Sequence, residues 1–150
     1  MPRILIVAYG NPLRCDDGLG WHAAEELSNL DLAQKLEIIT QHQLTPELAL
    51  PVSQADRVLF IDAARGRKPG ELRCEPVLPG RASSAFSHEF SPAGVLSLAR
   101  GIYGNAALAF AISLAGECFE HGTVLSESVQ EGLPRLLALV AQLAGDSVPG

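Results

Sequence analysis

Short apolar runs alternate with amphipathic segments along this chain. The runs cover residues 3–9, 36–40, 57–61, 71–77 and 107–114. The first of them, RILIVAY, is closed by Gly10 and Asn11, a pattern typical of a strand that is buried on both faces of a sheet. The run at 71–77 is expected at the edge of the sheet, because Pro76 has no backbone N–H to donate to a neighbouring strand.

Between these runs, apolar residues recur at the spacing of a helix. Four such segments begin near polar residues: Asp16, Thr45, Ser91 and Ser128. Ser128 with Glu131 fits a capping box, and Pro51 is expected to shorten or kink the second helix. The side chains expected to face the core are Leu19, Ala23, Leu27, Leu30, Leu48, Val52, Ala55, Val95, Leu96, Ala99, Ile102, Val129, Leu133, Leu136, Leu137, Val140 and Leu143.

The alternation of strands with helices predicts the fold class: α/β, with a mostly parallel sheet covered by helices on both faces. A chain of 150 residues that is 47% hydrophobic is long enough and apolar enough to bury one core. We therefore expect a single domain over residues 1–150, in which residues from about 145 onward form a frayed tail.

The charge balance bears on the partners of the protein. Seventeen acidic residues against eleven Lys and Arg give a formal net charge of −6, which leaves no basic footprint for nucleic acid. No polybasic run suggests a membrane surface, and no stretch approaches the roughly 18 apolar residues of a membrane span. Cys15, Cys74 and Cys118 are scattered, which disfavours a zinc site or a disulfide framework. The expected location is the cytoplasm.

Three polar groups follow predicted strands. Asp16 and Asp17 lie on the turn after the first strand, Asp62 follows the third, and His88 precedes the helix that begins near Ser91. In sheets of this kind, loops at the carboxyl ends of the strands carry the chemistry. Carboxylate oxygens with one imidazole nitrogen suit an open site for a divalent transition metal. The residues alone therefore predict a carboxylate-lined site at the sheet edge.

Each of these groups also has a purely structural interpretation. Asp16 or Asp17 near a helix N-terminus is usually a cap or a partner of the helix dipole. Asp62 can satisfy loop amides, and His88 can be a surface residue; spacing alone does not show that they converge. Neighbouring carboxylates are expected to raise the pKa of the Cys15 thiol, which disfavours it as a nucleophile. A second set of residues, with carboxylate, thiol and imidazole side chains, is expected to be an ordinary polar loop: Glu117, Cys118, Glu120 and His121.

The segment GNPLRCDDGLG at 10–20 also invites a phosphate-binding interpretation, because it joins a strand to a helix N-terminus. Its glycines, at positions 10, 18 and 20, do not match G-x-G-x-x-G or a P-loop. Two acidic side chains would repel a phosphate there, so a cation suits the site better. No G-x-S-x-G sequence supports serine hydrolase chemistry.

The same segment resembles the signature of the hydrogenase maturation endopeptidase family, G-N-x-L-x-x-D-[DE]-x-x-G. The matching residues are Gly10, Asn11, Leu13, Asp16, Asp17 and Gly20. Two later family positions match Asp62 in VLFIDAA and His88 in SHEFSPAGVLSLA, so the resemblance runs through nearly the whole chain.

This resemblance implies a three-layer sandwich with a twisted five-stranded sheet between helices. It implies that Asp17, Asp62 and His88 are the metal-contacting and catalytic side chains, supported by a turn made of Gly10, Asn11 and Asp16. The implied activity is an aspartic-type endopeptidase that removes the C-terminal peptide from the large-subunit precursor of a [NiFe]-hydrogenase. The implied metal is nickel, which the precursor supplies and which serves as the recognition element.

One segment departs from the common family pattern. Many members carry a turn rich in glycine and threonine after the second strand, where this chain has His42, Gln43 and Leu44. The HQL form resembles the subgroup that serves bidirectional, NAD(P)-linked hydrogenases, and the resemblance implies a role for this segment in substrate selection. A plain surface position is the alternative for His42. Two other functions stay open: a different metal-assisted hydrolase, and a non-catalytic module that binds a nucleotide or a partner protein.

Overall fold

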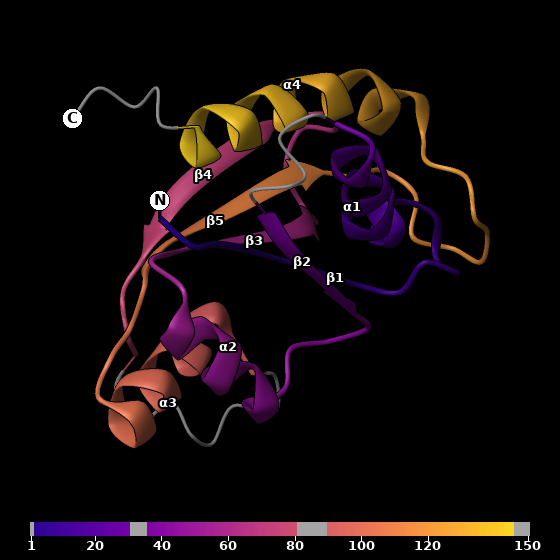
Figure 1. Ribbon diagram of the computed structural model, residues 1–150. Helices are drawn as coiled ribbons and strands as arrows, with labels where there is room; N and C mark the ends of the chain where they lie inside the picture. The colour runs from indigo at the N-terminus through magenta and orange to yellow at the C-terminus, as the bar shows by residue number, and fades with distance from the viewer. Residues whose placement is uncertain (1, 31–35, 81–89, 146–150) are drawn as a thin grey trace.

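The computed structural model describes residues 2–30, 36–80 and 90–145. His88 and the predicted tail beyond Gly145 lie outside the described residues. The elements, in chain order, are β1 (Ile4–Tyr9), η1 (Cys15–Gly18), α1 (Leu19–Ser28), β2 (Leu36–Gln41), η3 (Pro46–Leu48), α2 (Ala49–Gln54), β3 (Arg57–Ala64), β4 (Leu72–Val77), α3 (Pro92–Tyr103), β5 (Leu108–Ala115) and α4 (Glu127–Ala144); η1 and η3 are short 3₁₀ helices (Figure 1).

The five strands form one sheet in the order β2-β1-β3-β5-β4. The pairs β1–β2, β1–β3 and β3–β5 are parallel, and only β4 runs antiparallel, beside β5 at the edge. Pro76 lies in this edge strand, as predicted from its missing N–H. The predicted α/β fold with a mostly parallel five-stranded sheet is confirmed.

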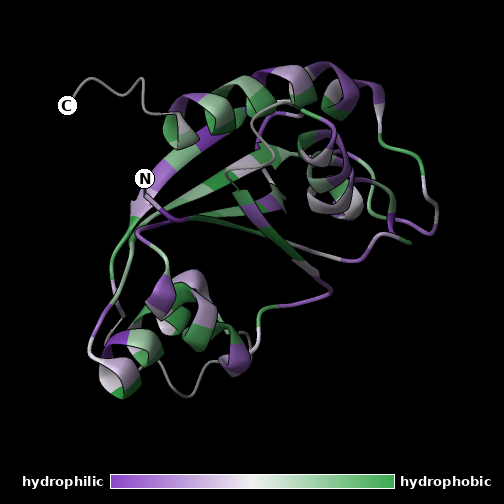
Figure 2. Ribbon diagram, in the orientation of Figure 1, coloured by the Kyte–Doolittle hydropathy of each residue, from purple (hydrophilic) through white to green (hydrophobic). Residues whose placement is uncertain are grey.

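Helices cover both faces of the sheet. In Figure 1, α1 and α4 lie on one side and α2 and α3 on the other. Alternate strand residues enter two separate apolar layers: Ile6 and Leu59 pack beneath α1 and α4, whereas Val7 and Phe60 pack beneath α2 and α3. This double burial explains why the central strands β1, β3 and β5 are mostly apolar, whereas the edge strand β4 carries several polar residues (Figure 2). Within the described segments, no helix has the length and apolarity needed to cross a membrane.

Two residues that were expected to face the core are exposed. The helix α1 ends at Ser28, so Leu30 lies beyond it and is 38% exposed. Ile102 is 62% exposed, because residues 100–105 all lie at the surface and the last turn of α3 projects past the core. The start of α3 is as predicted, since the Ser91 hydroxyl accepts a hydrogen bond from Gly94 N.

Two predicted element boundaries are wrong. The helix α4 begins at Glu127 with Ser126 at its N-cap, so the predicted capping box of Ser128 and Glu131 does not start the helix. The side chain of Ser126 donates a hydrogen bond to Asp16 instead of capping α4. Strand β3 continues to Ala64, because it stays paired with β5. Asp62 therefore lies within the strand rather than after it.

Candidate functional site

The register of two parallel strands places Tyr9 beside Asp62. Ala8 of β1 is paired with Ile61 of β3, so the next residue of each strand is also a neighbour of the other. Ala8 and Ile61 pack toward α1 and α4, and side chains alternate along a strand, so Tyr9 and Asp62 face the opposite side. There the Tyr9 side chain hydrogen-bonds to the Asp62 carboxylate.

A tight turn holds Asp17 close to the end of β1. The Asp17 Oδ2 atom accepts a hydrogen bond of 2.8 Å from Asn11 N. Gly10 has a φ of +140°, and a Cβ atom at this position would lie 2.1 Å from the carbonyl oxygen of Asp17. Only glycine fits there, because that distance is far below van der Waals contact. The Gly-Asn pair thus fixes the position of Asp17.

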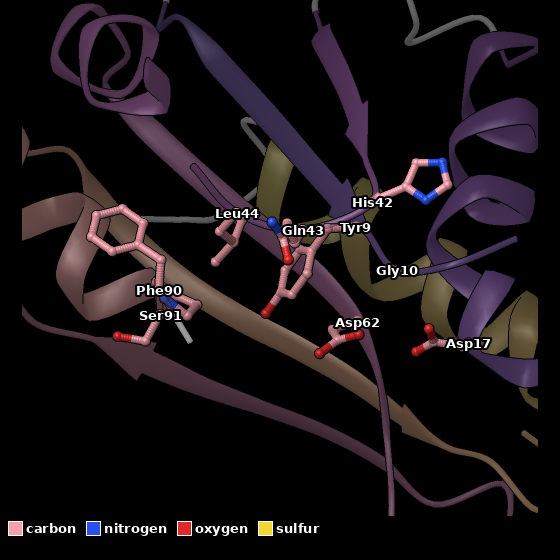
Figure 3. A pocket seen from close by; sticks show the side chains of 10 residues that line it. Tyr9, Gly10, Asp17, His42, Gln43, Leu44, Asp62, Phe90 and Ser91 are labelled. Carbon is pink, nitrogen blue, oxygen red and sulfur yellow. The ribbon is translucent and has the colours of Figure 1, made fainter. Parts of the chain in front are cut away.

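Asp17 and Asp62 open on one cavity of about 540 Å³. Its other lining residues are Tyr9, Gly10, His42, Gln43, Leu44, Phe90, Ser91 and Pro92. In Figure 3, the Asp62 carboxylate lies between the Tyr9 side chain and Asp17. Carboxylates that are distant in the sequence are therefore neighbours at the carboxyl edge of the sheet, where α/β folds bind ligands.

The surroundings of Asp62 raise its pKa from an ordinary value of 3.8 to about 7. Burial of the carboxyl is the largest cause, and the charge of Asp17 adds to it. Hydrogen bonds from Ala63 N and from Tyr9, together with the charge of Arg65, act in the opposite direction. A carboxyl group with a pKa near neutrality can both take up and release a proton at neutral pH. Such shifted pKa values are typical of functional sites.

The neighbouring Asp16 has a different environment. Its side chain is fully buried and accepts four hydrogen bonds. The donors are Glu117 N at 2.8 Å, Cys118 N at 3.0 Å, Ser126 N at 2.7 Å and the Ser126 hydroxyl at 2.8 Å. Burial alone would raise the pKa of Asp16, but these hydrogen bonds outweigh it and the pKa lies below its ordinary value. Asp16 therefore ties η1 to the segment between β5 and α4.

His42 lies directly after β2 and lines the same cavity. Its ring meets Trp21 of α1 edge to face, with 5.7 Å between the ring centroids and 73° between the planes. The Trp21 Nε1–H donates a hydrogen bond of 2.8 Å to the carbonyl oxygen of Gly10. Trp21 thus links His42 to the turn that carries Asp17. His42 is itself exposed, so its role in substrate selection stays a prediction.

Several residues of the site were not singled out from the sequence. Tyr9 and Phe90 of the cavity lining, and Trp21 beside it, carry no motif of their own, and their roles depend on which strands and helices are neighbours. One signal was present: Tyr9 is the sole polar side chain in the run ILIVAY, and it ends that run beside the Gly-Asn turn.

The structure brings together two of the three predicted site residues. His88 is not among the described residues, although Phe90 and Ser91, which follow it closely in sequence, line the cavity. Across the described ranges, no group of three or more His, Cys, Asp or Glu side chains is arranged to hold a metal ion. This includes Glu117, Cys118, Glu120 and His121, which belong to the loop between β5 and α4. The three-ligand metal site stays a prediction.

The Cys15 thiol has a raised pKa, as expected. The largest cause is a hydrogen bond to the Cys118 side chain, followed by burial and the charges of Cys118, Asp16 and Glu120. The carboxylates that were predicted to cause the shift therefore contribute less than the second thiol does.

Several solved structures with a similar fold are named as hydrogenase maturation proteases. No protein-family model and no curated protein matches the sequence. The hydrogenase maturating endopeptidase HybD from E. coli matches with a TM-score of 0.76 and 23% identity over 97% of this chain and 94% of that one. The [NiFe] hydrogenase maturation protease HybD from Thermococcus kodakarensis matches with a TM-score of 0.75 and 23% identity over 95% of this chain and 99% of that one. HycI from Thermococcus kodakarensis KOD1, also a [NiFe] hydrogenase maturation protease, matches with a TM-score of 0.74 and 24% identity over 95% of this chain and 92% of that one. Over nearly its whole length, the chain has the fold of these hydrogenase maturation proteases.

Proposed function

We propose that this protein is an endopeptidase that removes the C-terminal peptide from the large-subunit precursor of a [NiFe]-hydrogenase. The observation that carries the proposal is the pairing of Asp17 and Asp62 on one cavity, at the carboxyl edge of the sheet. Three solved proteins that share this fold over nearly the whole chain are named as hydrogenase maturation proteases or endopeptidases, which supports the same substrate class.

In this proposal, nickel enters the site as part of the precursor. The charge of Asp17 and the burial of Asp62 both disfavour ionisation of Asp62, and a cation between the two carboxylates would compensate for both effects. Oxygen donors from two carboxylates, with an imidazole from His88, form a donor set that a divalent transition metal accepts. Asp17, Asp62 and His88 would therefore contact the nickel of the bound precursor.

Positioning supplies much of the rate in this mechanism. Contact with the nickel holds the precursor in the cavity, and the adjoining peptide then lies along the carboxyl ends of the strands. Hydrolysis also requires activation of the attacking water. In the free protein the pKa of Asp62 is about 7; contact with the nickel would lower it and favour the carboxylate form, which can accept the proton of that water. Polarisation of the peptide carbonyl by the nickel of the precursor is the second route that the arrangement allows.

The segment His42–Gln43–Leu44 is proposed to select the precursor. All three residues line the cavity that contains Asp17 and Asp62, so a docked partner would contact them together with the acidic pair. The His42 ring contacts Trp21 edge to face at the rim of this cavity. We assign the preferred partner to the bidirectional, NAD(P)-linked class of hydrogenases on the basis of this HQL segment.

The test is to mix the purified protein with nickel-loaded and with nickel-free precursor and to weigh the products by mass spectrometry. Loss of a C-terminal peptide from the nickel-loaded precursor alone is expected. Equal cleavage of both forms would contradict recognition of nickel. Cleavage of an unrelated peptide, by protein that retains a tightly bound metal through purification, would indicate a different metal-assisted hydrolase.

A further inference from the structure

Two cysteines from distant parts of the chain meet beside the acidic turn. Cys15 begins η1, and Cys118 belongs to the segment between β5 and α4. The Cys15 thiol hydrogen-bonds to the side chain of Cys118, and both residues are partly exposed. Cys74, the third cysteine, lies on the edge strand β4 and is exposed. The pair is therefore distinct in position from the remaining thiol, and a small molecule can reach it.

Backbone hydrogen bonds hold the two segments together on both sides of this pair. Cys15 N donates to the carbonyl oxygen of Gly122 at 2.8 Å, and Asp16 N donates to that of Cys118 at 2.9 Å. The buried Asp16 carboxylate accepts from Cys118 N at 3.0 Å. Since each cysteine is anchored through its own backbone, the two sulfur atoms stay close together in the folded protein.

The backbone conformations of Cys15 and Gly122 leave room for the Cys15 sulfur. Cys15 has a φ of +48°, and it alone among the described non-glycine residues has a positive φ. That conformation is disfavoured for a residue with a side chain, so the surrounding contacts must hold it in place. A Cβ atom at Gly122 would lie 2.8 Å from Cys15 Sγ, so the missing side chain of Gly122 leaves room for the sulfur. The position of this thiol is thus imposed by the fold.

We propose that Cys15 and Cys118 form an oxidisable dithiol, which becomes an intramolecular disulfide on reaction with a small-molecule disulfide such as oxidised glutathione. One cysteine sulfur attacks the oxidant, forms a mixed disulfide and releases one glutathione thiol. The second cysteine then attacks the protein sulfur of that mixed disulfide and releases the second glutathione. Two S–H groups become one S–S bond, and the two electrons and two protons reduce the oxidant to two thiols.

This crosslink would join the turn after β1 to the segment after β5. The Asp16 carboxylate already links these two segments by hydrogen bonds. A disulfide there closes a loop that spans most of the chain, which restricts the unfolded state more than a short loop does. The oxidised protein should therefore unfold at a higher temperature than the reduced one. The inference goes beyond the proposed protease function and does not depend on it.

The test treats the reduced, purified protein with oxidised glutathione and measures its intact mass and peptide map. The expected product is lighter than the reduced protein by two hydrogen atoms and contains a Cys15–Cys118 crosslinked peptide. The variant Cys74→Ser should give the same crosslink, together with a rise in melting temperature that dithiothreitol reverses. The variants Cys15→Ser and Cys118→Ser should give no crosslink and instead keep one glutathione on the partner cysteine.

The wild-type protein decides the question even where a variant fails to fold. Separate glutathione adducts on Cys15 and Cys118, without a crosslink, would overturn the proposal. Modification of Cys74 alone, or no reaction at any cysteine under conditions that oxidise free dithiothreitol, would also overturn it.

Discussion

The Tyr9 hydroxyl hydrogen-bonds to the Asp62 carboxylate across two adjacent parallel strands. Two hydrogen bonds therefore hold the Asp62 carboxylate, because Ala63 N also donates to its Oδ1 at 2.7 Å. Tyr9 positions a group that is proposed to react, and it does so from a strand that is otherwise entirely apolar.

Replacement of Tyr9 by Phe should slow precursor cleavage while leaving the fold intact. The substitution keeps the ring and removes only the hydroxyl. A hydrogen bond to a charged group contributes about 1.5–3 kcal/mol, which corresponds to a fall in kcat of roughly tenfold or more if the bond is retained in the transition state. Steady-state kinetics with thermal unfolding test this. An unchanged kcat, or a change in KM alone, would contradict the positioning role.

Replacement of Asp62 by Asn should stabilise the free protein at pH 8 but not at pH 4. In the folded state the pKa of Asp62 is about 7, against an ordinary value of 3.8. Between these values the folded protein binds a proton that the unfolded chain lacks, so Asp62 lowers stability as pH rises. The gain for the variant at pH 8 should be on the order of 4 kcal/mol, since each pKa unit corresponds to about 1.4 kcal/mol. Urea denaturation at both pH values measures it, and a variant that is less stable at pH 8 would refute the expectation.

Replacement of Asp16 by Asn should destabilise the protein, the opposite of the effect expected for Asp62→Asn at pH 8. Asp16 accepts four hydrogen bonds in the interior, and an amide cannot accept them all because its nitrogen only donates. A loss of about 2–4 kcal/mol is expected near neutral pH.

The pKa of Asp16 is lowered, so its contribution is present above the ordinary carboxyl range and is lost as pH falls through its folded value. The deficit of the Asn variant should therefore shrink in acid. Asp17→Asn is the matched control, because Asp17 accepts a single described hydrogen bond, from Asn11 N, and should lose less stability. Equal losses in the two variants would contradict the structural role of Asp16.

Replacement of Gly10 by Ala should displace the turn that carries Asp17. The new methyl group would lie 2.1 Å from the Asp17 carbonyl oxygen, in a backbone conformation that Ala rarely adopts. The combined overlap and strain should cost roughly 2 kcal/mol or more and abolish cleavage. Gly101→Ala is the control: it lies in α3 with nothing within 4 Å of the new methyl group, and it should be neutral or slightly stabilising. Normal cleavage by the Gly10 variant would contradict the steric argument.

The fold and a carboxylate-lined edge of the sheet could be predicted from local patterns, whereas the choice of Asp17 over Asp16 rested on the family resemblance. Strands such as Ile4–Tyr9 are apolar because helices cover both of their faces, and the alternation of such strands with helices indicates a mostly parallel sheet. In such a sheet, the residues near carboxyl strand ends share one edge, which is why Asp17 and Asp62 emerged as neighbours.

Contacts that depend on register or on distant loops could not be predicted in this way. The pairing of Tyr9 with Asp62 requires knowledge that Ala8 pairs with Ile61. Ser126 was not recognised as the N-cap of α4. Its hydroxyl donates a hydrogen bond to Asp16, which is 110 positions away in the sequence. The exposed Ile102 shows the same limit, because helical periodicity does not tell where a helix leaves the core.

The central claim is that Asp17 and Asp62 act together on a nickel-bearing precursor. Its most direct test is the mass of nickel-loaded precursor after incubation with the wild-type protein or with one of three variants: Asp17→Asn, Asp62→Asn and Glu25→Gln. Glu25→Gln is the control, because it alters an exposed acid on α1. We predict that the precursor loses its C-terminal peptide with the wild type and with Glu25→Gln. We predict that it stays intact with both Asp variants, although these variants are folded. Processing at the wild-type rate by either folded Asp variant would contradict the claim.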